Sequence, residues 1–243
     1  MWQHVGVSHN GVLHWRQVKL KEQRQNHIPD IDDVCHTAIA EQELKHLVQW
    51  LRNNRANYPI QFLGFDINQN AKNLVERDEL MAKNIFGYAK ANPKSKLFIW
   101  AHNAHIKYNG HNKDEKPMGM FLRRWFGRDY FAIGQFFGYG SFSATVIDEK
   151  SPDWSNRSLS QITVNDVPDN FLEAKLHEID NKPYYLSDIG MTAFKNLGRV
   201  YSARSLGWGL VPTQLNTIVE KLDPTKDFSL LTYFPTTSPS QPL

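Results

Sequence analysis

The sequence predicts an α/β protein in which helices cover a largely parallel sheet in an α/β/α layered arrangement. Short apolar runs of strand length alternate with longer segments of helical periodicity between residues 37 and 147. Strand, helix, strand, helix, strand at this spacing is typical of such a fold. The 243 residues, 41% of them hydrophobic, suit one packed domain because no linker divides the chain.

The first 33 residues differ from the rest of the chain. They are polar and weakly patterned, and only GVLHWRQVKL (11–20) resembles a strand. We therefore expect an irregular N-terminal segment over residues 1–33 and the main domain over residues 34–243. From about Thr37 the pattern becomes helical, with apolar residues on one face of the helix at Leu44, Leu47, Val48 and Leu51.

A strand, a helix and a second strand follow. YPIQFLGFD (58–66) has the length and composition of a buried strand. Helical spacing of apolar residues predicts a helix from about Leu74 to Lys90, which Asn92-Pro93 ends because proline disfavours a helical residue before it. KLFIWA (96–101) is the next strand.

The remaining elements are less regular. A polar loop over residues 109–117 leads into a helix at MGMFLRRWF (118–126), and DYFAIGQFFGYGSFSATVI (129–147) predicts one or two strands broken by glycines. Further elements are expected as a helix at 168–177, a strand at 182–189, a short helix after the glycine-rich RSLGWGLVP (204–212) and a last strand at 227–234.

Polar residues that carry chemistry follow the two central strands. Asp66 ends the first strand, and His102 and His105 follow the second in the pattern H-N-x-H. Ligands of such sheets collect at the carboxyl ends of the strands. A neutral imidazole can activate water near pH 7, especially when a carboxylate such as Asp66, Glu76 or Asp78 orients it. The residues alone leave three readings open: a catalytic pair, part of a metal site, or hydrogen-bonded structural histidines.

Several classes of function lack support in the sequence. No G-x-S-x-G elbow, G-x-G-x-x-G turn or phosphate-binding loop is present, and Cys35 is the only cysteine. The net charge of +3 is mild, and the arginines at 123, 124 and 128 fit a solvated helical face, so we expect no nucleic-acid partner. No apolar run approaches the ~18 residues that span a bilayer, and we expect no signal peptide in the first residues, which lack a basic region and an apolar core. We expect a cytoplasmic protein without a membrane partner.

The order of short motifs resembles that of the erythromycin esterase family. The resemblance covers about residues 35–243 with similar gaps, and it rests on EQELKHLVQWLR (41–52), GFD (64–66), RDELMAKN (77–84), WAHNAHI (100–106), MGMFLRRWFGRDYFAIGQFFGYGSF (118–142), RSLG (204–207) and DFSLLTYFPTTSPSQPL (227–243).

The resemblance implies a hydrolase that opens a macrolide lactone, or a related ester, with a histidine-activated water. On this reading His102 and His105 are catalytic, with His102 favoured because it lies nearer the strand end. The residues implied to line or support the cleft are Asp66, Arg77, Asp78, Asn103 and Glu43. The substrate is a small ester or lactone, and neither a cofactor nor a metal is expected.

One family feature is absent from the chain. The family has a glycine-rich turn that carries a glutamate and a histidine with two residues between them. The first 33 residues have histidines at 4, 9, 14 and 27, and none has a glutamate three positions before it. We therefore expect the carboxyl-terminal part of a family member, with a complementary N-terminal segment as a further partner. The alternative is a non-catalytic remnant or binding chain that keeps the cleft but lacks the principal general base.

Overall fold

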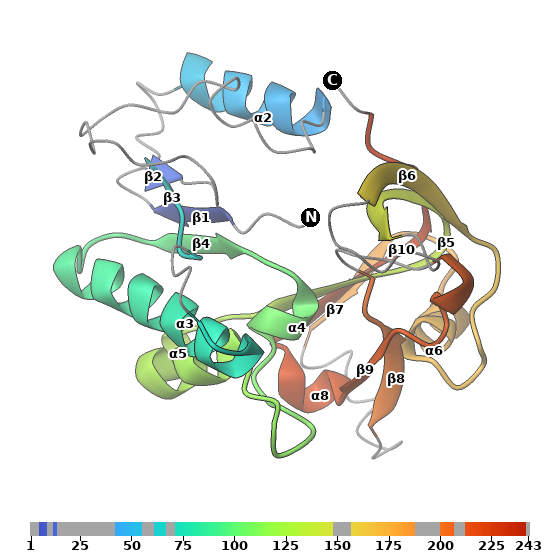
Figure 1. Ribbon diagram of the computed structural model, residues 1–243. Coiled ribbons are helices and arrows are strands. Elements are labelled where there is room, and N and C mark those ends of the chain that lie inside the picture. The colour runs from blue at the N-terminus through green and yellow to red at the C-terminus, as the bar shows by residue number, and fades with distance from the viewer. Residues whose placement is uncertain are drawn as a thin grey trace. The chain divides into compact units, whose positions relative to one another are not determined.

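The structure is a computed structural model that describes residues 5–8, 12–13, 42–54, 61–66, 71–147, 157–187, 200–206 and 212–241. The chain divides into two compact units, an N-terminal unit of residues 2–102 with 240–243 and a C-terminal unit of residues 103–239 with Met1. Figure 1 labels the elements of both. Cys35 lies outside the described residues, as do the histidines at 4, 9, 14 and 27. The expected division after residue 33 stays a prediction.

The N-terminal unit contains a four-stranded sheet in the order β2-β3-β1-β4. The bounds of its strands are β1 Val5–Ser8, β2 Val12–Leu13, β3 Gln61–Leu63 and β4 Leu97–Trp100. β1 pairs antiparallel with both β3 and β4, and β2 pairs parallel with β3. β1 belongs to the segment expected to be irregular, so the sequence pattern missed a central strand.

The helices of this unit are α2 (Gln42–Asn53) and α3 (Leu74–Ala91). α3 begins where Asn73 accepts a hydrogen bond from the Glu76 backbone N–H (2.9 Å), and its C-cap is Asn92, directly before Pro93. The predicted helix is confirmed. Asn84 Nδ2 donates to the Phe65 carbonyl (2.7 Å) and joins α3 to the segment that follows β3.

The C-terminal unit starts with two helices, α4 (Asn103–Ile106) and α5 (Met118–Phe126), and the 3₁₀ turn η1 (Gly127–Asp129). The helix predicted at 118–126 is confirmed. The region expected as one or two strands forms the single long strand β5 (Ile133–Ile147). Gly140, at φ +107°, provides a backbone conformation inside this strand that other residues rarely adopt.

β5 belongs to a sheet in the order β6-β5-β10-β7. Its other strands are β6 (Arg157–Val164), β7 (Tyr184–Leu186) and β10 (Leu230–Thr237), of which β10 runs parallel to β5. α6 (Leu172–Ile179) contacts β5, and Leu172, Leu176 and Tyr233 are fully buried. This core holds the sheet and α6 together.

A smaller pair of strands, β8 (Tyr201–Arg204) and β9 (Val219–Leu222), forms an antiparallel ribbon that the sequence pattern missed. The 3₁₀ turn η2 (Pro212–Gln214) lies between these strands in sequence, and α8 (Pro224–Asp227) follows β9. The expected last strand begins later than predicted, because Asp227 ends α8 and β10 starts at Leu230.

The expectation of a largely parallel sheet does not hold for the described strands. Five of their seven ladders are antiparallel, and only β2 with β3 and β5 with β10 are parallel. The physical reason in the N-terminal unit is the inserted strand β1. β3 and β4 run in the same direction, as a strand–helix–strand unit predicts, but β1 separates them and pairs antiparallel with each.

Candidate functional site

Two predicted site residues follow the ends of β3 and β4 at the same edge of the N-terminal sheet. Leu63 of β3 and Ile99 of β4 pair with Gly6 from opposite sides, and both strands run in the same direction. Asp66 lies three residues beyond Leu63, and His102 lies three residues beyond Ile99. With β1 between them, β3 and β4 are about 10 Å apart.

Asp66 and Arg77 form a bidentate ion pair. Arg77 Nε donates to both carboxylate oxygens of Asp66 (3.1 and 3.2 Å), and Nη2 donates to Oδ2 (2.5 Å). Arg77 belongs to the first turn of α3, so the capped start of that helix brings its side chain to the end of β3. The Asp66 side chain is only 4% exposed, and the neighbouring Asp78 is buried. Of the predicted site residues, Asp66 and Arg77 thus form a partly buried ion pair, and Asp78 is the next residue after Arg77.

The two histidines flank the start of α4. His102 lies two residues after the end of β4 and is half-buried, and His105 is half-buried within α4. Between them, Asn103 Nδ2 donates to the Gln135 carbonyl (2.7 Å), and Asn103 Oδ1 accepts from the Gln135 N–H (3.1 Å). These two bonds fix the first residue of α4 to β5.

Glu43 lies apart in the first turn of α2. Its side chain is exposed, and Oε2 accepts a hydrogen bond from the Gln241 N–H (3.4 Å). The Gln42 N–H donates to the Gln241 carbonyl (2.9 Å), so the start of α2 is joined to the last described residue of the chain. A role of Glu43 in a cleft stays a prediction.

The sequence pattern missed a buried polar network that begins one residue after α4. Lys107 is fully buried, and its ammonium forms ion pairs with Glu115 and with Glu220 of β9 (3.1 Å). Burial lowers the pKa of Lys107, but Glu220 and Glu115 more than offset this effect and the pKa is raised. Burial raises the pKa of Glu220 to about 7 although Lys107 opposes it. The raised pKa of Lys107 keeps its ammonium charged, whereas the raised pKa of Glu220 favours the neutral form of its carboxyl.

Arg204, from the family-like RSLG stretch, has a structural position. Its Nη2 donates to the carbonyls of Phe137 (2.8 Å) and Gly138 (2.7 Å) on β5. Its backbone N–H donates to the buried carboxylate of Glu173 (2.8 Å). Burial lowers the pKa of Arg204 and raises that of Glu173. Arg204 therefore joins β8 to β5 and α6.

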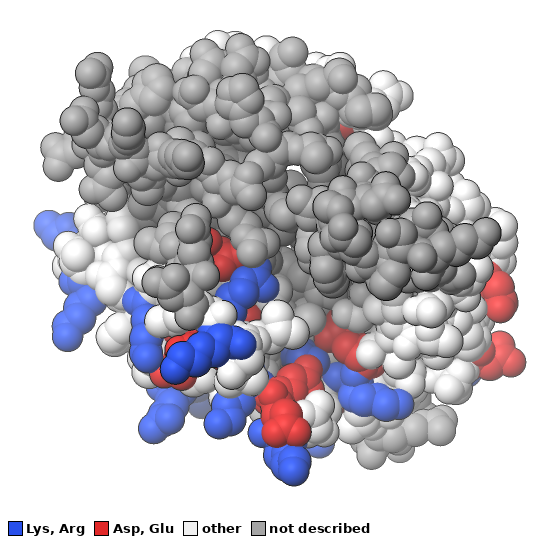
Figure 2. Space-filling model, in the orientation of Figure 1, with Lys and Arg blue, Asp and Glu red and all other residues white. Residues whose placement is uncertain are grey.

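The described residues contain no group of three or more His, Cys, Asp or Glu side chains arranged to hold a metal ion. Among the same residues, no helix is long and apolar enough to cross a membrane. Figure 2 shows Lys and Arg side chains interspersed with Asp and Glu on the described part of the face in view. The expected absence of a nucleic-acid partner stays a prediction.

Comparison with solved structures shows similarity to longer proteins. A succinoglycan biosynthesis protein is 17% identical, with a TM-score of 0.54 over 70% of this chain and 41% of its own. A protein from Bacillus cereus is 16% identical, with a TM-score of 0.54 over 70% of this chain and 40% of its own. An erythromycin esterase mutant in its open conformation is 14% identical, with a TM-score of 0.49 over 80% of this chain and 43% of its own. The chain spans about two fifths of the length of these proteins.

A search of curated proteins finds no significant match. The profile of the erythromycin esterase family matches residues 67–207. This range contains Arg77, Asp78 and the H-N-x-H segment, and it begins one residue after Asp66. Because the match covers more than half of the chain, the protein belongs to the erythromycin esterase family.

Proposed function

We propose that the protein is a carboxylic ester hydrolase that opens a macrolide lactone, or a related ester, with a histidine-activated water. The observation that carries the proposal is the position of His102. It follows β4 at the sheet edge where Asp66 follows β3 and binds Arg77 of α3, and the adjacent Asn103 is held by two hydrogen bonds. Family membership supports the reaction class.

The proposed reaction needs no covalent bond between the enzyme and the substrate. The neutral imidazole of His102 takes a proton from water, and the water oxygen forms a bond to the acyl carbon. The bond between that carbon and the ring oxygen then breaks, and the departing alkoxide receives the proton that His102 took from the water. The products are a carboxylic acid and an alcohol. A histidine base agrees with the lack of a G-x-S-x-G elbow in the sequence.

A second candidate is a chain that binds a lactone without hydrolysing it. The observation that favours it is the sequence of residues 1–33, where no histidine has a glutamate three positions before it. Such a chain would hold the ligand, or a complementary chain, through the remaining residues of the family site.

Both candidates can be tested with erythromycin. For the hydrolase, mass spectrometry should show the macrolide gaining one water, and His102→Ala should abolish the product. His46→Ala, which changes an exposed histidine of α2, should retain activity. An unchanged rate in His102→Ala would show that the assigned role of His102 is wrong. Erythromycin binding by calorimetry without product would favour the second candidate.

A further inference from the structure

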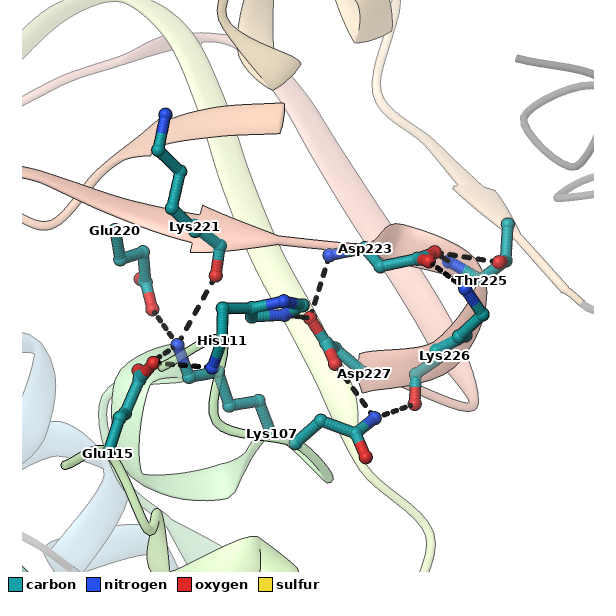
Figure 3. A network of polar contacts seen from close by, with 10 residues as sticks. Lys107, His111, Glu115, Glu220, Lys221, Asp223, Thr225, Lys226 and Asp227 are labelled. Atoms are coloured by element: carbon teal, nitrogen blue, oxygen red, sulfur yellow. Dashed lines mark hydrogen bonds and ion pairs between the residues drawn. The ribbon is translucent and has the colours of Figure 1, made fainter. Parts of the chain in front are cut away.

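The segment that follows α4 contains a fully buried charge. The Lys107 ammonium contacts the carboxylates of Glu115 and Glu220 and lies 3.4 Å from the Lys221 carbonyl. Figure 3 shows these three oxygen atoms around the lysine nitrogen. An ammonium has three donors, so the three acceptors define its position.

A second set of bonds joins the same loop to α8. The His111 ring contacts the buried carboxylate of Asp227 through Nε2 (2.5 Å), and Asn109 donates to the other oxygen (3.0 Å). The His111 backbone N–H donates to Glu115 (2.7 Å), which joins the two sets (Figure 3). The loop after α4 is therefore attached to β9 and α8, more than 100 residues away in sequence.

The buried ammonium of Lys107 is better explained by a role in positioning the backbone after α4 than by a contribution to the free energy of folding. Removing two charges from water often costs as much free energy as their mutual attraction supplies. Apolar residues of similar volume frequently stabilise a fold equally well. A buried ammonium with three acceptors, by contrast, allows few orientations of the backbone to which it is attached. Lys107 lies two residues after His105.

We propose that Lys107, held by Glu115 and Glu220, is a positioning residue for His105. α4 is only four residues long and is fixed at both ends, by the Asn103–Gln135 bonds at its start and by Lys107 just after its end. His105 lies between these two attachments. The inference rests on the proposed function, in which His105 belongs to the catalytic pair.

The test uses the full chain and two substitutions. Glu115→Gln removes one charge around Lys107 at a side chain that is 28% exposed, so it is the milder change. Lys107→Met removes the ammonium and keeps the apolar stem. The matched control is Glu79→Gln, which removes the charge of an exposed pair with Lys83. The first readout is the NMR signal of the His105 ring in histidine-labelled protein, assigned with His105→Asn.

We expect Glu115→Gln to shift and broaden the His105 ring signals while Glu79→Gln leaves them unchanged. With an ester that the wild type hydrolyses, kcat should fall by up to about a hundred-fold without a matching change in KM. In a His105→Ala background, Glu115→Gln should have no further effect on kcat. Unchanged His105 signals in folded Glu115→Gln would overturn the inference, and this substitution decides the question if Lys107→Met does not fold. A wild type without hydrolysis would refute the proposed function alone, since the NMR readout does not depend on turnover.

Discussion

Replacing Lys107 by methionine should destabilise the protein by an amount that depends on pH. The substitution keeps most of the apolar stem and removes the ammonium, which leaves Glu220 buried without its cation. Breaking a buried ion pair by removing one partner typically costs about 3–5 kcal/mol. We expect this full loss of unfolding free energy at about pH 8, where Glu220 is ionised in the wild-type fold.

The cost should shrink at lower pH. The pKa of Glu220 is already raised to about 7 by burial, and Lys107 is the group that lowers it. Without Lys107 that pKa rises further, so at about pH 5.5 the carboxyl is protonated and neutral. Because pH 8 lies about one unit above the wild-type pKa of about 7, the cost at pH 5.5 should be smaller than at pH 8 by up to about 1.4 kcal/mol.

Urea denaturation followed by circular dichroism at both pH values measures this difference. Lys83→Met is the matched control, because Lys83 pairs with Glu79 on the surface, where a lysine–carboxylate pair is worth less than about 1 kcal/mol. The reasoning is refuted if Lys107→Met costs no more than Lys83→Met at pH 8, or if its cost is the same at both pH values.

Three further perturbations follow from the geometry. Glu220 has a raised pKa in the fold, so it should contribute a loss of up to about 3 kcal/mol of stability as pH rises from 4.5 to about 7. Glu220→Gln should remove this contribution and so flatten the dependence of the urea midpoint on pH. Asp66→Asn should cost about 2–3 kcal/mol in urea unfolding because Arg77 loses its carboxylate; a cost within error of zero would contradict the ion pair. Gly119→Ala should cost about 1–3 kcal/mol of unfolding free energy, because the added methyl would meet the Ile106 carbonyl oxygen at 2.1 Å. Gly87→Ala in α3 should stabilise the protein, because no atom beyond the helix backbone and the adjacent residues lies within 4 Å of the added methyl. Equal effects of the two substitutions on thermal unfolding would refute the close packing at Gly119.

Features set by neighbouring residues could be predicted from the sequence. α3 begins at the capping Asn73 and ends before Pro93, and both signals lie within a few residues of the helix. The position of His102 at a strand end follows from the apolar run before it in the same way. Such local signals were sufficient for the helices at 74–91 and 118–126.

Features set by distant partners could not be predicted. β1 is only four residues long, and its partners β3 and β4 lie more than 50 and about 90 residues away, so no local pattern marked it as central. The same holds for Lys107, since its partner Glu220 is 113 residues away. A single lysine after a short helix gives no sign that its charge is buried until those partners are known.

The measurement that tests the central claim most directly is chemical rescue of His102→Ala with free imidazole, in an assay that counts erythromycin molecules gaining one water. If His102 activates the water, the substitution should slow ring opening by about 10²–10⁴-fold, and imidazole should restore part of the rate in proportion to its concentration. His46→Ala should keep the wild-type rate with or without imidazole. A wild-type rate in His102→Ala, or a loss that imidazole does not reverse, would contradict the account.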